Sequence, residues 1–260
     1  MNKKFIAAAS AAIMAVQGIA MPIIANAEAS ATYITDSCFT DCAIGGAANK
    51  GYYGLNILLD DSPWLSKGSA SVHYETYMHD DELDIDYCNM YTNSDKTGSN
   101  DGAGSMYMYQ RDTTSNFSQT YGYCQFDIRM HEGTMGLMLG SFSDPTSNTD
   151  YIANTITFTA SQITAMDGAS SITLANITTD KWYTVKIAVN NILQEMDISV
   201  TDTETGKVIG SVEKAAYYQS ACTKVCIWCF SYVRGNTYNY DLTHVTIDKS
   251  TEKTNPYSVL

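Results

Sequence analysis

Three acidic side chains alternate in the segment ELDID, at Glu82, Asp84 and Asp86. If this segment is a strand, the three carboxylates point to one face, with about 7 Å between successive members. Nucleophile and acid/base pairs of glycoside hydrolases can be built on such a spacing. An acidic strand face that only meets water has the same pattern and is favoured. The segment is therefore the candidate catalytic site only if the protein is an enzyme.

A second group of candidate side chains is aromatic and polar. In the segment YGYCQFDIRMH, period-two alternation puts Cys124, Phe126, Ile128 and Met130 on one apolar face. The residues on the opposite face are Tyr121, Tyr123, Gln125, Asp127, Arg129 and His131. Aromatic rings on the opposite face could stack on the C–H faces of sugars, while amides, carboxylates and guanidinium groups bind hydroxyls. Alternatively, these tyrosines only cover a solvated sheet face, or an N-terminal arm covers them. The candidate ligand-binding residues are Tyr107, Tyr109, Tyr121, Tyr123, Gln125, Asp127, Arg129, Trp228 and Tyr232.

The cysteines offer a weaker candidate for a metal site. The spacing Cys222-x3-Cys226-x2-Cys229 is that of the iron–sulfur cluster in radical SAM enzymes, but here it lies in a strand-like run near the end of the chain. Zinc would need a fourth ligand such as His244. A disulfide or simple packing is the favoured interpretation. The number of cysteines is odd, so at least one is unpaired or pairs between molecules; they are Cys38, Cys42, Cys88, Cys124, Cys222, Cys226 and Cys229.

The composition narrows the class of ligand. The formal net charge is −13 at pH 7, and the chain contains 19 tyrosines. Such a surface repels phosphate backbones and anionic lipids, so nucleic-acid binding is disfavoured. A neutral or cationic ligand suits the chain better than a polyanion.

The first 27 residues have a basic start, a long apolar stretch and a small-residue ending at Ala25, Asn26 and Ala27. This pattern predicts a secretory signal peptide and a secreted, extracellular protein. No second apolar stretch follows, so we expect no membrane insertion after cleavage. We expect residues 28–66 to form an N-terminal arm with one strand at 55–59, residues 67–250 to form a single domain, and residues 251–260 to form a polar tail.

The elements that would position these side chains are short strands. Residues 182–189 and 196–201 alternate with period two, and Glu204, Thr205 and Gly206 then turn the chain into a third strand. About ten to twelve such strands follow one another between turn-forming segments, with no long helical pattern. The predicted fold class is all-β, a two-sheet antiparallel β-sandwich or jelly roll.

Within residues 105–248, the segments GYCQFDIRM, KWYTVKIAVN, DISVTDTETGKVIG and YDLTHVTID resemble the concanavalin A-like lectin/glucanase superfamily, which includes laminin-G-like jelly rolls. The resemblance implies a glycan-binding concave sheet or loop rim, and in some members a structural calcium ion, for which loop aspartates Asp144, Asp150 and Asp241 are candidates. ELDID resembles the E-x-D-x-E signature of laminarinase-type hydrolases, with Asp86 in place of the second glutamate.

The leading hypothesis is a secreted, non-catalytic, lectin-like protein that binds a polysaccharide through the aromatic and polar sheet face. One alternative is a jelly-roll glycoside hydrolase or polysaccharide lyase. Another is a surface or adhesion protein without a glycan ligand, which the odd number of cysteines favours slightly through intermolecular pairing.

Overall fold

The structure is a computed structural model that describes residues 32–37, 47–49, 64–67, 73–92, 107–111, 121–141, 151–225, 227–230 and 237–250. These residues form strands and turns, with no helix among them, so this part of the chain has no helix that could cross a membrane. The strands are β1 (Thr32–Ser37), β2 (Ala47–Asn49), β3 (Trp64–Lys67), β4 (His73–Asp80), β5 (Ile85–Thr92), β6 (Tyr107–Arg111), β7 (Tyr121–Gly140), β8 (Ile152–Thr159), β9 (Gln162–Asp167), β10 (Ser170–Asn176), β11 (Trp182–Asn190), β12 (Glu195–Asp202), β13 (Lys207–Ala216), β14 (Ile227–Phe230) and β15 (Tyr238–Ser250).

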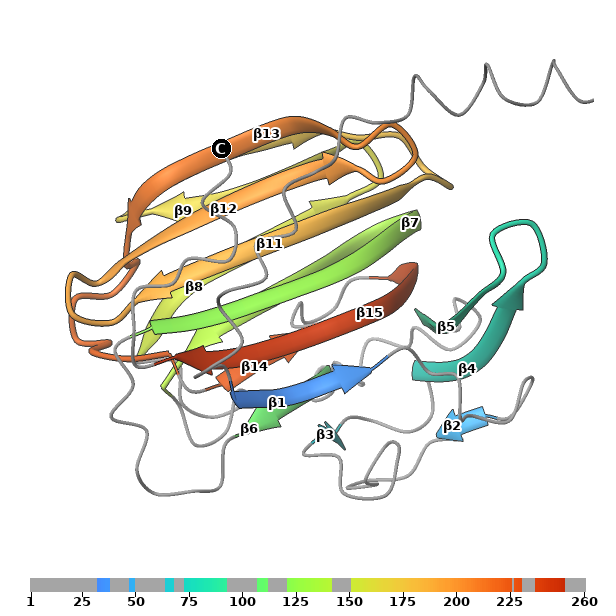
Figure 1. Cartoon of the computed structure of the whole chain (residues 1–260), viewed down its shortest axis with the longest axis horizontal. Helices are drawn as coiled ribbons and strands as arrows, with labels where there is room; N and C mark the ends of the chain where they lie inside the picture. The colour runs from blue at the N-terminus through green and yellow to red at the C-terminus, as the bar shows by residue number, and fades with distance from the viewer. Residues whose placement is uncertain are drawn as a thin grey trace, which may run out of the picture. The chain divides into compact units, whose positions relative to one another are not determined.

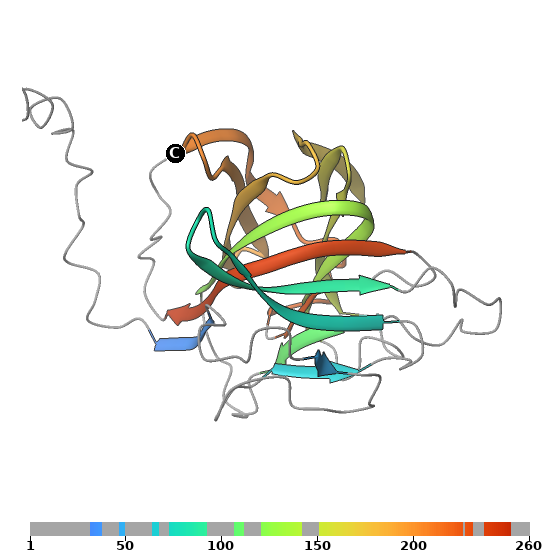
Figure 2. The same cartoon turned by 90° about the vertical axis from the view of Figure 1, so that its right-hand side faces the viewer.

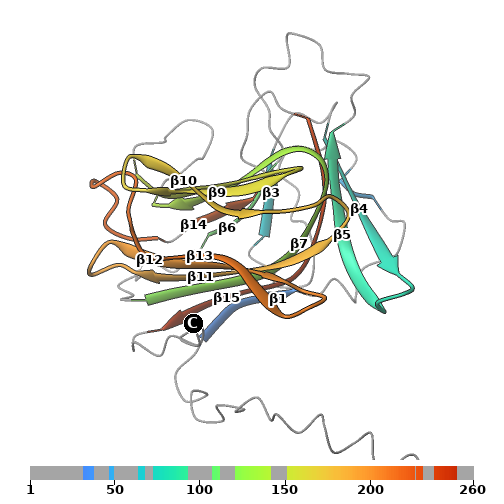
Figure 3. The same ribbon diagram turned by 90° about the horizontal axis from the view of Figure 1, so that it is seen from above.

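The strands form two antiparallel layers, seen edge-on in Figure 3. Sheet A runs in the order β13, β12, β11, the first half of β7, and β15 (Figure 1). One part of β15 also pairs with β1, and another pairs with β5, which continues to β4 and β2. Sheet B runs β10, β9, β8, the second half of β7, β14, β6 and β3. The predicted two-sheet antiparallel β-sandwich is confirmed.

Strand β7 belongs to both sheets. Its residues up to Met130 pair with β11 and β15, whereas Thr134 to Gly140 pair with β8 and β14. The change of sheet occurs at Gly133, whose φ of +76° is a conformation that glycine adopts without steric cost. A Cβ at this position would lie 2.0 Å from the Thr237 carbonyl oxygen. Glycine is therefore required where β7 changes sheet.

The core lies between the two sheets and follows the predicted alternation. Cys124, Phe126, Ile128 and Met130 of β7 are all buried. Buried side chains on the neighbouring strands of sheet A continue this layer, at Tyr183, Val185, Ile187, Val189, Met196, Ile198 and Val200. Phe126 packs edge-on against Phe158 and Phe230 of sheet B, with ring centroids 6.0 and 5.1 Å apart. Period-two alternation therefore identified the core face of sheet A correctly.

Two expectations about the chain path differ from the structure. Residues 81–84, which include the first three residues of the ELDID segment, form the turn between β4 and β5, so the predicted continuous strand is wrong. The reason is local: Asp80 accepts hydrogen bonds from the backbone N–H groups of Glu82 and Leu83, and Asp84 adopts a positive φ of 54°. In addition, residues 28–66 contain β1, β2 and the start of β3 instead of one strand, and the strand predicted at 55–59 lies outside the described residues.

Candidate functional site

The outer face of sheet A, which points away from the core, carries the polar side chains of β7. These are Tyr121, Tyr123, Gln125, Asp127 and Arg129, the residues that alternate with the buried core positions. Strand β11 lies antiparallel beside them, and its pairing extends from Asn190 opposite Tyr121 to Trp182 opposite Arg129. Sheet pairing thus places the outward-facing polar side chains of β7 and β11 next to each other.

Two cavities open on this face, one at each end of the polar row. The larger cavity, which we name the Arg129 pocket, has a volume of about 520 Å³. It is formed by the β4–β5 turn, β7, the start of β11, the β12–β13 turn and β15. Its lining residues are Asp80, Glu82, Leu83, Ile85, Asp127, Arg129, Asp180, Lys181, Trp182, Thr203, Glu204 and His244. The smaller, the Tyr121 pocket, has a volume of about 250 Å³, and its lining includes Tyr121, Tyr123, Asn190, Glu195, Asp197 and Lys214.

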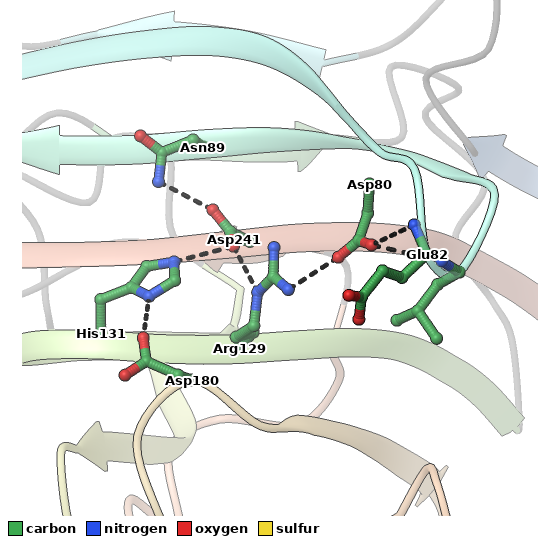
Figure 4. A network of polar contacts seen from close by, with 8 residues as sticks. Asp80, Glu82, Asn89, Arg129, His131, Asp180 and Asp241 are labelled. Carbon is green, nitrogen blue, oxygen red and sulfur yellow. Dashed lines mark hydrogen bonds and ion pairs between the residues drawn. The ribbon is translucent and has the colours of Figure 1, made fainter.

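Arg129 lines the larger pocket and contacts two carboxylates and two aromatic rings. Its Nε donates to Asp241 Oδ2 at 2.7 Å, and one terminal nitrogen donates to Asp80 Oδ2 at 2.9 Å (Figure 4). The guanidinium carbon lies 5.0 Å from the ring centroid of Tyr87 and 4.6 Å from that of Trp182. Burial alone would lower the pKa of Arg129, but the hydrogen bonds that its guanidinium donates to Asp241 and Asp80 produce a net rise. Arg129 therefore remains charged and ties three segments together.

His131 extends this network to the loop before β11. Its Nδ1 lies 2.5 Å from Asp180 Oδ1, and its Nε2 lies 2.8 Å from Asp241 Oδ2 (Figure 4). Because carboxylates only accept, both ring nitrogens must donate, which requires the charged imidazolium. The hydrogen bond to Asp241 is the largest cause of a raised pKa, partly opposed by burial. Asn89 donates to the other Asp241 oxygen at 2.7 Å, so both oxygens of this carboxylate are occupied.

This geometry predicts a pH-dependent contribution to stability. Since the folded-state pKa of His131 lies above the ordinary 6.5, its stabilising contribution is complete below pH 6.5 and is lost as the pH rises through the folded-state value. We expect the melting temperature of wild type to exceed that of His131→Gln most at about pH 6, and the difference to shrink toward about pH 9. Thermal scans of both proteins at each pH measure it, and a difference that does not change with pH would show that the ring is neutral.

Asp127 forms a second polar cluster beside Arg129. Thr184 Oγ1 donates to Asp127 Oδ1 at 2.6 Å, and His244 Nδ1 lies 2.6 Å from Asp127 Oδ2. His244 has a positive φ of 49°, within the irregular stretch where the pairing of β15 with β7 shifts between Thr243 and Thr246. This irregularity brings His244 into the lining of the Arg129 pocket. The arrangement can bind hydroxyl groups, and an imidazole next to a carboxylate can also accept or donate a proton.

The structure divides the predicted aromatic platform. Tyr121 and Tyr123 line the Tyr121 pocket, although Tyr123 is only 2% exposed, and Asp127 and Arg129 line the other pocket. Gln125 lies between the two ends on β7. Trp228 does not share this face, because it lies on β14 of sheet B, is 3% exposed and belongs to the core. The backbone of Tyr107 and Tyr109 is also in sheet B, on β6, and Tyr232 lies outside the described residues.

The three carboxylates of ELDID do not form a row. Glu82 reaches the lining of the Arg129 pocket from the β4–β5 turn. The Asp84 side chain is 98% exposed, and Asp86 lies on β5 with its Oδ1 2.7 Å from His79 Nδ1. Glu82 alone of the three therefore faces the candidate binding site.

The metal candidates are only partly within the described residues. Asp241 does not fit a calcium site, because Arg129, His131 and Asn89 occupy both of its oxygens. Asp144 and Asp150 lie outside the described residues, and so does Cys226. Among the described residues, no group of three or more His, Cys, Asp or Glu side chains could hold a metal ion.

The described cysteines are packed in the interior. Cys88, Cys124, Cys222 and Cys229 are buried, and burial raises the pKa of the Cys124 thiol well above its ordinary value. The Cys222 thiol also donates to the Lys224 carbonyl at 3.2 Å. These positions agree with packing as small apolar groups.

Several residues of the site were not singled out from sequence. Asp80, Asp180, Lys181, Trp182 and Thr184 were all missed as site residues, and His131 was assigned only to the polar face. The sequence did contain one indication of this site. In the predicted strand 182–189, Trp182 and Thr184 alternate with the core residues and therefore lie on the outer face.

The fold is a two-sheet antiparallel β-sandwich of the jelly-roll type, and its outer face is polar. Among solved structures, the chain is similar to a protein of unknown function, SO2946 from Shewanella oneidensis MR-1, with 8% identity over 75% of this chain and 82% of that chain and a TM-score of 0.50. It also matches the CBM2 module of the evolved Dit protein of Lactobacillus casei BL23 phage J-1, with 11% identity over 86% of this chain and 98% of that chain and a TM-score of 0.47.

A third match is the exoplasmic/lumenal domain of VIP36 in its Ca2+/Man2-bound form, with 8% identity over 78% of this chain and 88% of that chain and a TM-score of 0.43. A sialidase is matched over 71% of this chain but over only 20% of its own length. No protein-family model and no curated protein sequence matches the chain. At these identities the likeness is one of fold.

Proposed function

We propose that this is an exported, non-catalytic protein that binds a polysaccharide along the outer face of sheet A. The observation that carries the proposal is the pair of cavities at opposite ends of one polar row. Tyr121 and Arg129 are eight positions apart on β7, which corresponds to roughly 26 Å of extended strand. A row of this length accommodates several sugar units of one chain. The N-terminal signal-like sequence supports export.

The side chains between the two cavities suit hydroxyl-rich ligands. Gln125 faces Lys186 across the β7–β11 pair, and Asp127 faces Thr184. The side chains of Gln125, Thr184 and Lys186 are all partly exposed. Amide, carboxylate, hydroxyl and ammonium groups together supply both donors and acceptors for sugar hydroxyls. Tyr121, also partly exposed, adds an aromatic ring at one end.

The carboxylate geometry supports a non-catalytic role. Glycoside hydrolysis requires two carboxyl groups on opposite sides of the scissile bond. Of the three ELDID candidates, only Glu82 lines the Arg129 pocket, and Asp86 forms a hydrogen bond with His79. Other lining carboxylates are also engaged: Asp80 with Arg129, and Asp127 with Thr184.

A glycoside hydrolase or polysaccharide lyase is the second candidate, favoured by the His244–Asp127 contact in the lining of the Arg129 pocket. Such a pair could remove or supply a proton during bond cleavage. If the wild-type protein releases products from a polysaccharide and His244→Gln does not, the protein is an enzyme of this second class.

The proposal predicts that Tyr121→Ala combined with Gln125→Ala weakens polysaccharide binding about tenfold, because about 1.4 kcal/mol of stacking and hydrogen bonding is removed. Pull-down on insoluble polysaccharides and affinity electrophoresis would measure binding, with released reducing ends and unsaturated products assayed in parallel. Tyr218→Ala is the matched control, since Tyr218 is exposed and lines neither cavity. Unchanged binding in the double variant would exclude this face, and silence in every assay would favour an adhesion role without a glycan ligand.

A further inference from the structure

The Arg129 pocket has a surplus of negative charge. Five of its lining side chains are acidic, two are basic groups that stay charged, Arg129 and Lys181, and one is the His244 imidazole, which contacts Asp127. Both basic groups are already engaged: Arg129 bonds to the two carboxylates described above, and the Lys181 ammonium lies 2.8 Å from Asp202 and 3.3 Å from Glu204. An anionic ligand would have to separate an existing ion pair to obtain a cation. The pocket is therefore unsuited to uronic acids and sulfated sugars.

Glu82 differs from the other acidic groups of the pocket. Its side chain is exposed, and within the described residues its carboxylate forms no hydrogen bond or ion pair. Figure 4 shows this side chain reaching from the β4–β5 turn toward the strand that carries Arg129. Glu82 thus offers an acceptor of full negative charge that is not neutralised by a neighbouring protein cation.

A second and independent feature is the indole N–H of Trp182. This side chain lines the same pocket and is 7% exposed, and its Nε1 atom is buried and has no hydrogen-bond partner among the described residues. A buried N–H donor without an acceptor is destabilising, so such groups are rare. One lining residue therefore carries a buried donor without a partner in the described part of the chain, and another, Glu82, carries an exposed carboxylate.

We propose that the Arg129 pocket binds a sugar unit that carries a protonated primary amine, as in glucosamine polymers, in preference to neutral, N-acetylated or acidic sugars. This inference rests on the proposed polysaccharide-binding function. The ammonium group binds Glu82, and the Trp182 ring turns on binding so that its buried Nε1 donates to a hydroxyl oxygen of the same sugar. A lysine side chain could satisfy only the first of these two groups, since it has no acceptor.

Isothermal titration calorimetry at about pH 6 and low salt tests the proposal with four probes: the β-1,4-linked tetramers of glucosamine, of N-acetylglucosamine and of glucose, and a tetramer of uronic acid. The glucosamine tetramer is expected to bind about tenfold more tightly than the two uncharged tetramers, and the uronic acid tetramer to bind most weakly. Raising the salt concentration should reduce this preference.

The matched variants are Glu82→Gln and Glu213→Gln. Both glutamates are exposed, but Glu213 lines neither pocket. Glu82→Gln should remove most of the preference for the glucosamine tetramer and leave the melting temperature unchanged, whereas Glu213→Gln should keep the preference. Equal loss in both variants would show a general charge effect and overturn the proposal.

The remaining outcomes separate this inference from the function on which it rests. Binding of the glucose tetramer as tightly as the glucosamine tetramer would overturn the amine preference and leave polysaccharide binding intact. No binding of any tetramer would overturn both. Tetralysine is the control for the source of the amine, and its binding as tightly as the glucosamine tetramer would overturn the assignment to a sugar.

Discussion

Arg129→Met is expected to lower the free energy of unfolding by about 3–5 kcal/mol, because it removes the guanidinium partner of the buried Asp241 carboxylate. Asp241 is 1% exposed and accepts from Arg129, His131 and Asn89. Asp80 loses its partner in the same substitution, and the contact of the guanidinium with Trp182 is also removed. Urea unfolding monitored by tryptophan fluorescence would measure the loss.

Lys181→Met is the matched control for this prediction. Its ammonium also contacts two carboxylates, but the Lys181 side chain is 33% exposed. Exposed ion pairs contribute little, so we expect a much smaller loss than in Arg129→Met. Similar losses in the two variants would contradict the central role of the buried Asp241. The double variant Arg129→Met with Asp241→Asn should recover part of the loss, since the buried charge at position 241 is then removed together with the guanidinium.

Gly133→Ala is expected to cost about 4 kcal/mol or more, because strain and a clash act at one position. The φ of +76° disfavours any Cβ, and the added atom would lie 2.0 Å from the Thr237 carbonyl oxygen. That oxygen also accepts from the Thr134 N–H at 3.0 Å, so it cannot withdraw without breaking a backbone hydrogen bond. Differential scanning calorimetry of the purified variant would show a large fall in melting temperature.

Gly206→Ala separates the two causes. Gly206 has a φ of +67° in the β12–β13 turn, but nothing lies within 4 Å of the position of its Cβ. Only the backbone strain remains, and we expect a loss of about 1–2 kcal/mol. Equal losses at Gly133 and Gly206 would mean that β7 can shift away from Thr237, which would contradict the close packing where it changes sheet.

The core layer of sheet A could be predicted from sequence because its strands are buried on one face and partly exposed on the other. Phe126 and Ile128 on β7, and Val185 and Ile187 on β11, alternate with polar residues as this arrangement requires. The same pattern failed for β14. Trp228, Cys229 and Phe230 are all buried, so this strand is covered on both faces and alternation cannot tell which side chains point outward.

The ELDID segment shows a different limit. Its alternation of acidic and apolar residues is compatible with a strand, but the hydrogen bonds from two backbone N–H groups to Asp80 stabilise a turn there instead. Leu83 is accordingly exposed at that turn and is not part of the core. Short polar side chains can form hydrogen bonds with the nearby backbone, and these bonds compete with strand pairing. The period-two pattern of the sequence does not detect this competition.

The polar network of the site could be predicted only in part. Sequence alternation placed Arg129 and His131 together on one face, but the partners Asp80, Asp180 and Asp241 come from three other segments. Their meeting depends on the register between β7 and β15, where Asp241 is opposite Arg129. No local pattern determines such a register between segments more than one hundred residues apart.

The position of β15 also governs when the protein can fold. This last strand of the described chain lies between β7 and the strands β1 and β5, as the red strand of Figure 2 shows beside the teal β4–β5 hairpin. Until a ribosome has released residues 238–250, β7 has an open edge and β1 has no partner. The nascent chain therefore cannot complete sheet A during most of its synthesis, and the long loops that must close make the final step slow.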